Sequence, residues 1–155
     1  MPAETLREFL NSHQVEYSTT KHPPAYTAQE IAAISHTPGR ELAKSVIIKL
    51  DGKMVMVVLP ASRRINFSRL KEVTDAKTVE LATEREFDAL FPDCQLGAMP
   101  PFGNLYDMKV LVDNSLADDE EIVFNACTHR ELIRLSFKDF TRLVKPRILE
   151  FTWKP

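Results

Sequence analysis

Two apolar runs that flank a two-residue turn constrain the fold of this chain more than any other feature. In the segment LAKSVIIKLDGKMVMVVLP, β-branched residues and methionines lie on both sides of Asp51-Gly52. An Asp-Gly pair between two such runs is typical of a tight β-hairpin, because both residues tolerate the positive φ angles of the turn. The sequence therefore predicts antiparallel strands near residues 44–50 and 53–59.

Shorter elements are predicted on both sides of this hairpin. Thr27 to Glu30 and Thr83 to Glu86 are capping boxes, which open helices, and the second helix is expected to continue to Phe91. Ser136 is expected to cap a further helix. Helical spacing also occurs near residues 2–10 and in RRINFSRLKEV, whereas extended segments are predicted at residues 16–21, 78–81, 109–113, 120–126, 131–136 and 147–153.

The order of these elements indicates the fold class. Strands and short helices follow one another irregularly, whereas a doubly wound sheet needs a regular alternation of strand and helix. We therefore expect an α/β protein of the α+β type, with a mixed, curved, largely antiparallel and barrel-like sheet and flanking helices. A chain of 155 residues suffices for one domain that buries about two-thirds of its unfolded surface, so residues 1–155 are expected to form a single domain.

Composition excludes several classes of protein. No apolar run approaches the roughly 18 residues of a membrane span, and the first ten residues lack the basic and apolar parts of a secretion signal. We therefore expect a soluble, cytoplasmic protein without membrane contact. The formal net charge of −2 argues against a protein that coats nucleic acid generally but allows a local phosphate contact. The motifs GxGxxG, Walker A and GxSxG are absent, which argues against dinucleotide binding and serine hydrolase chemistry.

The cysteine pattern does not indicate a metal site. Cys94 and Cys127 are the two cysteines, and neither has the CxxC or Cys/His spacing of a zinc site. We expect no metal, no other cofactor and no disulfide, with both cysteines present as buried or half-buried free thiols.

Lys44 is the first candidate for chemistry. Period-two alternation puts its side chain on the same side of the predicted strand as Val46, Ile48 and Leu50. If that side is core, the lysine at its rim either extends its ammonium group to solvent or holds it in a cavity where the cation meets a partner. The pattern leaves both alternatives open.

A histidine, an asparagine and a loop are further candidates. His129 lies in the short link between two predicted strands, and Asn125 within IVFNA needs hydrogen-bond partners from the backbone or from a substrate if it is buried. The loop GAMPPFG at residues 97–103 has a path set by glycine and proline, and it could offer several donors to a substrate oxygen. These donors are the N–H groups of Gly97, Ala98, Met99 and Phe102.

A cluster of cations follows the hairpin. Four basic residues occur within nine positions and form either a solvated helix face or a contact with a phosphate backbone: Arg63, Arg64, Arg69 and Lys71.

The order of these signals resembles a known family. YTAQEIA, ELAKSVIIK, VMVVLPA, GAMPPFGN and IVFNACTHRELIRL together resemble the YbaK/ProX family of aminoacyl-tRNA deacylases, which is related to the editing insertion of bacterial prolyl-tRNA synthetase. The resemblance extends from about Tyr17 to Val144 and implies the YbaK/ProRS-associated domain fold. Cys127 stands where members of the family commonly carry glycine, so a requirement for positive φ there would demand a different local backbone.

The resemblance implies a trans-editing hydrolase. Such an enzyme removes a small amino acid, such as alanine, serine, threonine or cysteine, from a mischarged tRNA by water attack on the ester. The implied catalytic residues are Lys44, Gly97 of the GxxxP loop and the pocket histidine His129. The expected substrate-binding residues are Ser45, Ala98, Met99, Pro100, Pro101, Phe102, Gly103, Asn125 and Thr128, and the expected tRNA-binding residues are Arg63, Arg64, Arg69 and Lys71.

The same resemblance implies the partners. They are the acceptor end of an aminoacyl-tRNA and an aminoacyl-tRNA synthetase, whereas DNA, which lacks the 2′-hydroxyl group, is not expected to bind. Other functions stay open at this point: a non-catalytic aminoacyl- or nucleotide-binding module, a synthetase-associated regulatory module, and a hydrolase of another small ester or amide. The joint presence of Lys44, the GxxxP loop and His129 favours the deacylase.

Overall fold

The computed structural model describes residues 2–35, 37, 39–92 and 94–153. Within this part of the chain the strands are β1 (Tyr17–Lys21), β2 (Leu42–Leu50), β3 (Lys53–Pro60), β4 (Val79–Leu81), β5 (Val110–Asp113), β6 (Glu121–Asn125), β7 (Glu131–Ser136) and β8 (Arg147–Leu149). The α-helices are α1 (Pro2–Ser12), α2 (Ala28–Ser35), α3 (Phe67–Thr74), α4 (Glu84–Phe87) and α5 (Phe137–Val144). The 3₁₀ helices are η1 (Asp88–Leu90), η2 (Gly103–Tyr106) and η3 (Asn114–Asp118). None of the helices in these residues is long and apolar enough to cross a membrane.

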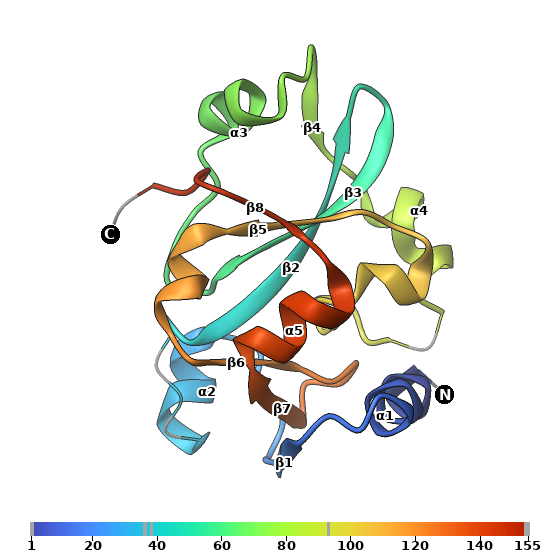
Figure 1. Ribbon diagram of the computed structural model, residues 1–155, viewed down its shortest axis with the longest axis vertical. Coiled ribbons are helices and arrows are strands. Elements are labelled where there is room, and N and C mark those ends of the chain that lie inside the picture. The colour runs from blue at the N-terminus through green and yellow to red at the C-terminus, as the bar shows by residue number, and fades with distance from the viewer. Residues whose placement is uncertain (1, 36, 38, 93, 154–155) are drawn as a thin grey trace.

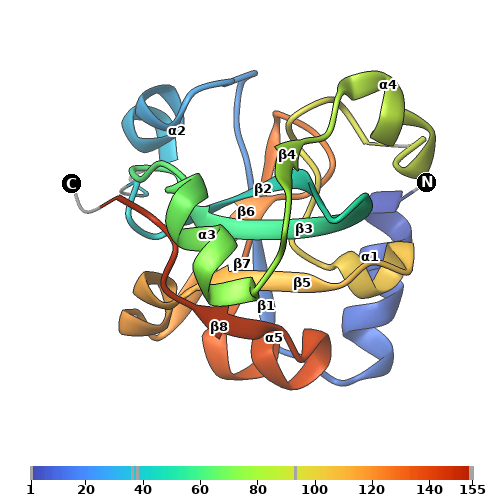
Figure 2. The ribbon, with the colours of Figure 1, turned by 90° about the horizontal axis from the view of Figure 1, so that it is seen from above.

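The strands form one mixed, curved sheet with flanking helices, as predicted. Their order is β1-β7-β6-β2-β3-β5-β8, and β4 also pairs with β2. Neighbouring strands are antiparallel in β1–β7, β7–β6, β2–β3 and β2–β4, and parallel in β6–β2, β3–β5 and β5–β8. Figures 1 and 2 show the helices around the outside of this sheet, with α1 and α2 on opposite sides of the molecule.

The hairpin that the sequence predicted is the centre of the sheet. β2 and β3 pair from Leu50 and Lys53 beside the turn to Ala43 and Pro60 at the far end. The turn residues Asp51 and Gly52 have φ angles of 50° and 84°. The Asp51 carboxylate also accepts hydrogen bonds from the N–H groups of Thr78 and Lys77, at 2.9 and 2.8 Å, and these bonds hold the pKa of Asp51 below its usual value. They attach the turn to the start of β4.

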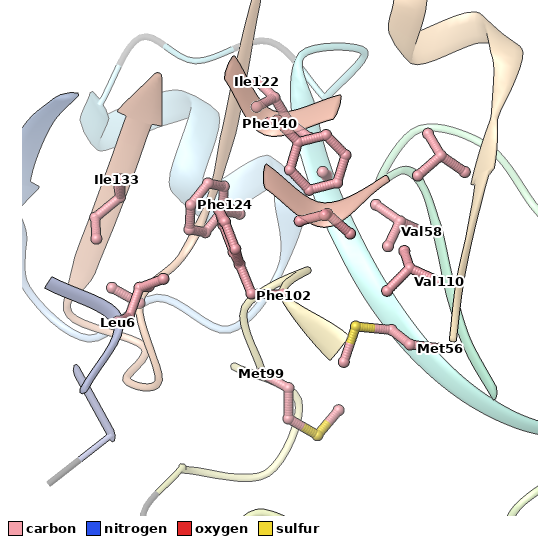
Figure 3. Packing of buried hydrophobic residues seen from close by; sticks show 14 of the residues in the cluster. Leu6, Met56, Val58, Met99, Phe102, Val110, Ile122, Phe124, Ile133 and Phe140 are labelled. Atoms are coloured by element: carbon pink, nitrogen blue, oxygen red, sulfur yellow. The ribbon is translucent and has the colours of Figure 1, made fainter. Parts of the chain in front are cut away.

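The two faces of β2 pack against different parts of the molecule. Ala43 and Ile47 face the main core, which contains three neighbouring aromatic rings. These rings belong to Phe102, Phe124 and Phe140, and the centroid of Phe102 lies 5.5 and 5.6 Å from the other two (Figure 3). Ile48 on the opposite face packs in a second cluster with Leu70 of α3 and Phe151. The strand is therefore covered on both faces along most of its length.

The helix starts predicted from capping residues are confirmed, but two helices are shorter than expected. α3 begins at Phe67 instead of covering all of RRINFSRLKEV, because Asn66 caps it and Ile65 pairs with Thr152. Thr83 and Glu86 form the capping box of α4, and the side chains of Thr27 and Ser136 accept N–H bonds at the starts of α2 and α5. The expectation of one helix from Thr83 to Phe91 is wrong, because α4 ends at Phe87 and η1 follows. The N–H of Phe91 bonds to the carbonyl of Asp88 at 3.2 Å, which is the tighter spacing of a 3₁₀ turn, and the proline that follows Phe91 disfavours helical geometry there.

The expectation of free thiols is also wrong. Cys94 and Cys127 form a disulfide, with their Cα atoms 4.3 Å apart. The carbonyl of Cys127 accepts a bond from the N–H of Gln95 at 2.8 Å, which holds the two segments together next to the disulfide. Spacing could not predict the pair, because 33 residues separate the cysteines and only the folded chain brings them together.

One pH-dependent contribution to stability arises where α4 meets β2. The ammonium group of Lys49 donates to Glu86 at 2.6 Å, and this bond, with the N–H of Thr83, lowers the pKa of Glu86 to about 2 from a usual value of 4.5. A carboxyl group whose pKa is lower in the folded state stabilises the fold above its unfolded pKa and loses this effect as the pH falls through the folded pKa. Glu86→Gln is therefore expected to be less stable than the wild type above pH 4.5, with a difference that disappears toward pH 2.

Denaturant unfolding at a series of pH values measures this difference. Glu84→Gln is the matched control, because Glu84 is exposed and belongs to the same helix. A difference between wild type and Glu86→Gln that does not change between about pH 6 and about pH 2 would contradict the assignment.

Candidate active site

Lys44 is a half-buried cation without a carboxylate partner. It lies opposite Leu59 in the β2–β3 ladder and on the same face as Ile48, as the alternation predicted. No hydrogen bond or ion pair of its ammonium group is found among the described residues. Burial lowers the pKa of Lys44, and the positive charge of Arg64 lowers it further. Such a cation opposes folding, and groups with perturbed pKa values are concentrated at functional sites.

The edge of β2 beside Lys44 is not paired with another strand. β6 pairs with this edge only as far as Ala43, opposite Phe124, and β4 pairs with it from Ile48 onward. The carbonyl of Leu42 accepts the N–H of Ala61 on the β3 side. Because the direction of main-chain groups alternates along an antiparallel ladder, the N–H and C=O of Ser45 point to the open edge. A stretch of main chain is therefore left open next to the lysine.

Two polar side chains flank this open edge. If the parallel register of Ala43 and Phe124 is continued by one residue, Asn125 lies beside Lys44 on the same face. Ser45 points to the other face, toward the main core. The Asn125 Oδ1 and Ser45 Oγ atoms are both buried and have no hydrogen-bond partner in the part of the chain that the structure describes. The backbone partner considered for Asn125 is therefore not found among the described residues, and both atoms keep an unsatisfied hydrogen-bonding capacity.

His129 presents a buried lone pair to the same end of the sheet. Its ring is 9% exposed, and Nε2 lies 2.7 Å from the carbonyl oxygen of Leu96. A carbonyl oxygen only accepts hydrogen bonds, so Nε2 donates, and Nδ1 of the neutral ring carries the lone pair. Nδ1 is buried and has no partner. The main chain of His129 is also held, because its N–H donates to the side chain of Gln95 at 2.9 Å.

The loop of residues 97–103 lies against this histidine. Gly97 has a φ angle of +81°, and a Cβ atom at this position would lie 3.6 Å from Cε1 of His129. The carbonyl of Ala98 accepts the N–H of Cys127 at 2.9 Å, which joins the loop to the link before His129. The N–H groups of Gly97 and Met99 take part in no hydrogen bond within the described part of the chain. These two donors are therefore free to bind an oxygen atom, as an oxyanion-binding loop requires.

Comparison with known proteins identifies the family to which this arrangement belongs. Residues 22–143 match the family model described as "Aminoacyl-tRNA editing domain". The chain belongs to this family. A proline–tRNA ligase from Staphylococcus saprophyticus is 33% identical to it over 129 residues, which are 80% of this chain and 22% of the ligase. A proline–tRNA ligase from Bacillus mycoides is 26% identical over 128 residues, which are 81% of this chain and 22% of that ligase.

Solved structures share the fold of this editing-family chain. A protein proposed to be a trans-editing enzyme for prolyl tRNA synthetase is similar with a TM-score of 0.84 at 18% identity, over 99% of this chain and 98% of that chain. A hypothetical protein is similar with a TM-score of 0.85 at 20% identity, over 96% and 99% of the two chains. The editing-family chain therefore spans about 22% of the length of the curated ligases that it matches, but nearly the full length of these two solved chains.

Most side chains of the GxxxP loop in this family member pack into the core. Met99 and Phe102 belong to the main hydrophobic cluster (Figure 3), and Ala98, Pro100 and Pro101 are buried as well. The N–H of Ala98, which the sequence analysis counted among the available donors, bonds to the carbonyl of Gln95 at 3.0 Å, so that expectation is wrong. The buried side chains therefore hold the path of the loop.

Three residues, at the end of the loop and in the link between β6 and β7, have a structural role in the backbone. A Cβ atom on Gly103 would lie 2.7 Å from Val110 Cγ2, so only glycine fits there. Thr128 Oγ1 accepts the N–H of Arg130 at 3.2 Å within the link between β6 and β7. Cys127 has a φ angle of +69°, so the link keeps a positive φ without a glycine, which is a conformation that L-residues rarely adopt. The positive φ therefore did not demand a different local backbone.

The structure divides the predicted cation cluster into two parts. Arg63 and Arg64 follow the end of β3, and the charge of Arg64 acts on Lys44. Arg69 and Lys71 lie on α3, where both are exposed and Arg69 forms an ion pair with Glu72 at 3.1 Å. Arg64 is therefore the member of the cluster whose charge acts at the candidate site, and Arg63 precedes it in the chain.

Two residues of the site were not selected from the sequence. The ring of Tyr26 lies 4.7 Å from that of His129, and Tyr26 is 67% exposed. His22 is buried, with Nδ1 donating to the carbonyl of Pro23 at 2.7 Å and Nε2 without a partner. No local pattern around Tyr26 or His22 predicts a chemical role. Main-chain bonds from His22 and Ala25 to Arg130 and His129 bring this segment to the site, and local patterns do not show such long-range bonds.

The candidate site does not coincide with either of two surface depressions of the described residues. Two surface depressions, of about 340 and 390 Å³, lie between η3 and α5 and between α3 and β4, and neither contains Lys44 or His129. Among the described residues, no group of three or more His, Cys, Asp or Glu side chains could hold a metal ion. The groups at the site are thus one cation, two free N–H donors and buried acceptors, which suit an ester next to a ribose and phosphates.

Proposed function

We propose that this protein is an aminoacyl-tRNA deacylase that acts in trans on tRNA mischarged with a small amino acid. The observation that carries the proposal is the half-buried, unpaired cation of Lys44 beside an open strand edge with the unsatisfied polar atoms of Ser45, Asn125 and His129 nearby. Membership of the editing-domain family supports this assignment. The similarity to segments of proline–tRNA ligases supports prolyl-tRNA synthetase as the associated synthetase.

In this proposal Lys44 acts as an electrostatic clamp. Burial and the charge of Arg64 disfavour its cationic form in the free protein, which is seen as a lowered pKa. A negative charge brought by the substrate relieves this cost, so the cation binds a phosphate or a developing oxyanion strongly. A role as general base is not required, because an aminoacyl ester is already reactive toward water.

The remaining groups position the ester. The free N–H groups of Gly97 and Met99 stabilise the carbonyl oxygen as the water oxygen adds to the carbonyl carbon. The bond from that carbon to the ribose oxygen then breaks, the ribose oxygen takes a proton, and a free amino acid and uncharged tRNA result. His129 Nδ1 accepts a hydrogen bond from a ribose hydroxyl, because its lone pair is the free position of the ring. The neighbouring ribose hydroxyl of the RNA orients the attacking water.

A panel of charged tRNAs tests the proposal. Purified protein is incubated with tRNAs that carry alanine, serine, threonine, cysteine or proline, and loss of the amino acid is followed over time. We expect release well above the buffer rate for at least one small non-cognate amino acid. Each charged tRNA without protein is the control. Binding of charged tRNA without release of any amino acid would contradict the deacylase and favour a non-catalytic binding module.

A further inference from the structure

Trp153 is an exposed aromatic side chain without a part in the proposed reaction. It is the single tryptophan of the chain and is 60% exposed. It has no ring contact with another aromatic residue in the described part of the chain. Its indole ring is therefore available to a partner.

The main chain around Trp153 is nevertheless firmly held. The N–H of Trp153 donates to the carbonyl of Arg64 at 2.9 Å, and Thr152 forms an antiparallel bridge with Ile65. The preceding Phe151 is fully buried, and its N–H donates to the Asp113 carboxylate at 3.0 Å. Residues 64–66 and 151–153 thus form a two-stranded segment, here called the C-terminal ribbon. In Figures 1 and 2 the chain reaches it on the side of the molecule where α3 lies.

The register of the C-terminal ribbon puts an aromatic residue opposite a basic residue. The bridge between Ile65 and Thr152 puts Arg64 directly opposite Trp153, and opposite residues in an antiparallel pair lie close together on one face. Neither Arg63 nor Arg64 forms an ion pair with an acidic side chain among the described residues, although Arg63 donates to Thr152 at 3.3 Å. The charge of Arg64 also acts on Lys44. Arg63 and Arg64 therefore place positive charge, without an acidic partner among the described residues, beside Trp153, and the charge of Arg64 also acts at the candidate site.

We propose that Trp153 and Arg64 form a stacking platform for an unpaired base of a single-stranded RNA 3′ end, while Arg63 and Arg64 contact its phosphates. Proteins that hold single strands combine an aromatic face for the base with cations for the backbone, and both occur here on one rigid ribbon. The absence of acidic partners among the described residues at these arginines favours an anionic strand over a neutral or basic protein surface. The inference rests on the proposed function for its choice of RNA and adds how the strand is held.

The intrinsic fluorescence of Trp153 gives a direct test that needs no deacylation. The protein is titrated with an uncharged RNA hairpin that ends in an unpaired ACCA-3′ strand and, separately, with the same hairpin with a blunt end. We expect the overhang to quench the fluorescence and the blunt hairpin to leave it nearly unchanged. With a labelled overhang hairpin, Trp153→Ala is expected to weaken binding about 10-fold or more, whereas Trp153→Phe keeps most of the affinity.

Matched arginine variants separate the platform from general charge. Arg64→Ala is expected to weaken binding and to reduce its salt dependence, whereas Arg142→Ala, whose arginine is exposed on α5 and paired with Asp139, is expected to have little effect. Equal binding of overhang and blunt hairpins, or unchanged affinity of Trp153→Ala, would overturn the platform. If amino acid is released but the overhang hairpin leaves the fluorescence of Trp153 unchanged, the stacking platform alone is refuted. If the overhang hairpin quenches this fluorescence but no amino acid is released, the proposed function alone is refuted.

Discussion

Replacing Lys44 with methionine is expected to lower the rate of deacylation at least 100-fold while the protein stays folded. Removal of one group that stabilises a developing oxyanion typically costs about 10²- to 10³-fold in kcat. Methionine keeps most of the volume of the side chain and removes its charge. Single-turnover deacylation of a charged tRNA measures the loss, and Lys53→Met is the matched control, because Lys53 lies exposed on the neighbouring strand.

Stability measurements separate this function from a structural role. The pKa of Lys44 is lowered in the folded state, so its cation opposes folding at neutral pH. This destabilisation is fully present below the folded pKa and disappears as the pH rises through that value toward the unfolded pKa of 10.5. Lys44→Met is therefore expected to melt at the same temperature as the wild type or higher. Full activity of Lys44→Met, or loss of activity together with unfolding, would contradict the assigned role.

Replacing Asp113 with alanine is expected to lower the free energy of unfolding by about 2–4 kcal/mol. Asp113 is fully buried at the end of β5, and its two carboxylate oxygens have different partners. Oδ1 accepts the N–H of Phe151, and Oδ2 accepts both the N–H and the hydroxyl group of Ser115. Alanine leaves the buried N–H of Phe151 and the two half-buried donors of Ser115 without this acceptor. Denaturant unfolding measures the loss.

Two variants define the origin of this effect. Asp113→Asn is expected to recover only part of the stability, because an amide has one acceptor oxygen where the carboxylate uses two. Asp118→Ala is the control, since Asp118 is exposed in the following 3₁₀ helix, and we expect a change within about 0.5 kcal/mol. A midpoint of Asp113→Ala equal to that of the wild type would show that these bonds do not hold the C-terminal ribbon in place.

The regular elements could be predicted because their signals are local. The Asp51-Gly52 turn between two apolar runs specifies its hairpin, and the capping residues Thr83 and Ser136 specify helix starts, since each depends on residues only a few positions apart. The shortening of the predicted helix at η1 also has a local cause. The proline after Phe91 predicts where the helix ends, and it also disfavours α-helical geometry in the turn before it. The fold class followed from the irregular order of these elements.

The candidate site could be predicted from the sequence only in part, because it joins segments that are far apart in the chain. Strand alternation, the glycine-proline loop and the link between two strands indicate Lys44, Gly97 and His129 as candidates, and the family resemblance implies their catalytic roles. The structure adds the open edge of β2, which none of these residues encodes alone. Tyr26 was missed because its contact with His129 depends on main-chain bonds between distant segments. The burial of Met99 and Phe102 likewise depends on which side of the loop meets the core.

The amino-acid sequence by itself determined which segments are strands, where the helices begin and which face of β2 carries Lys44, because turn geometry, capping and side-chain alternation act over a few residues. Only the tertiary structure decided that Cys94 meets Cys127, that Ala43 pairs with Phe124 next to Lys44, and that Arg64 lies opposite Trp153. Each of these pairs joins segments far apart in the chain. Their proximity depends on the pairing of strands and the burial of a shared core, which no local pattern contains.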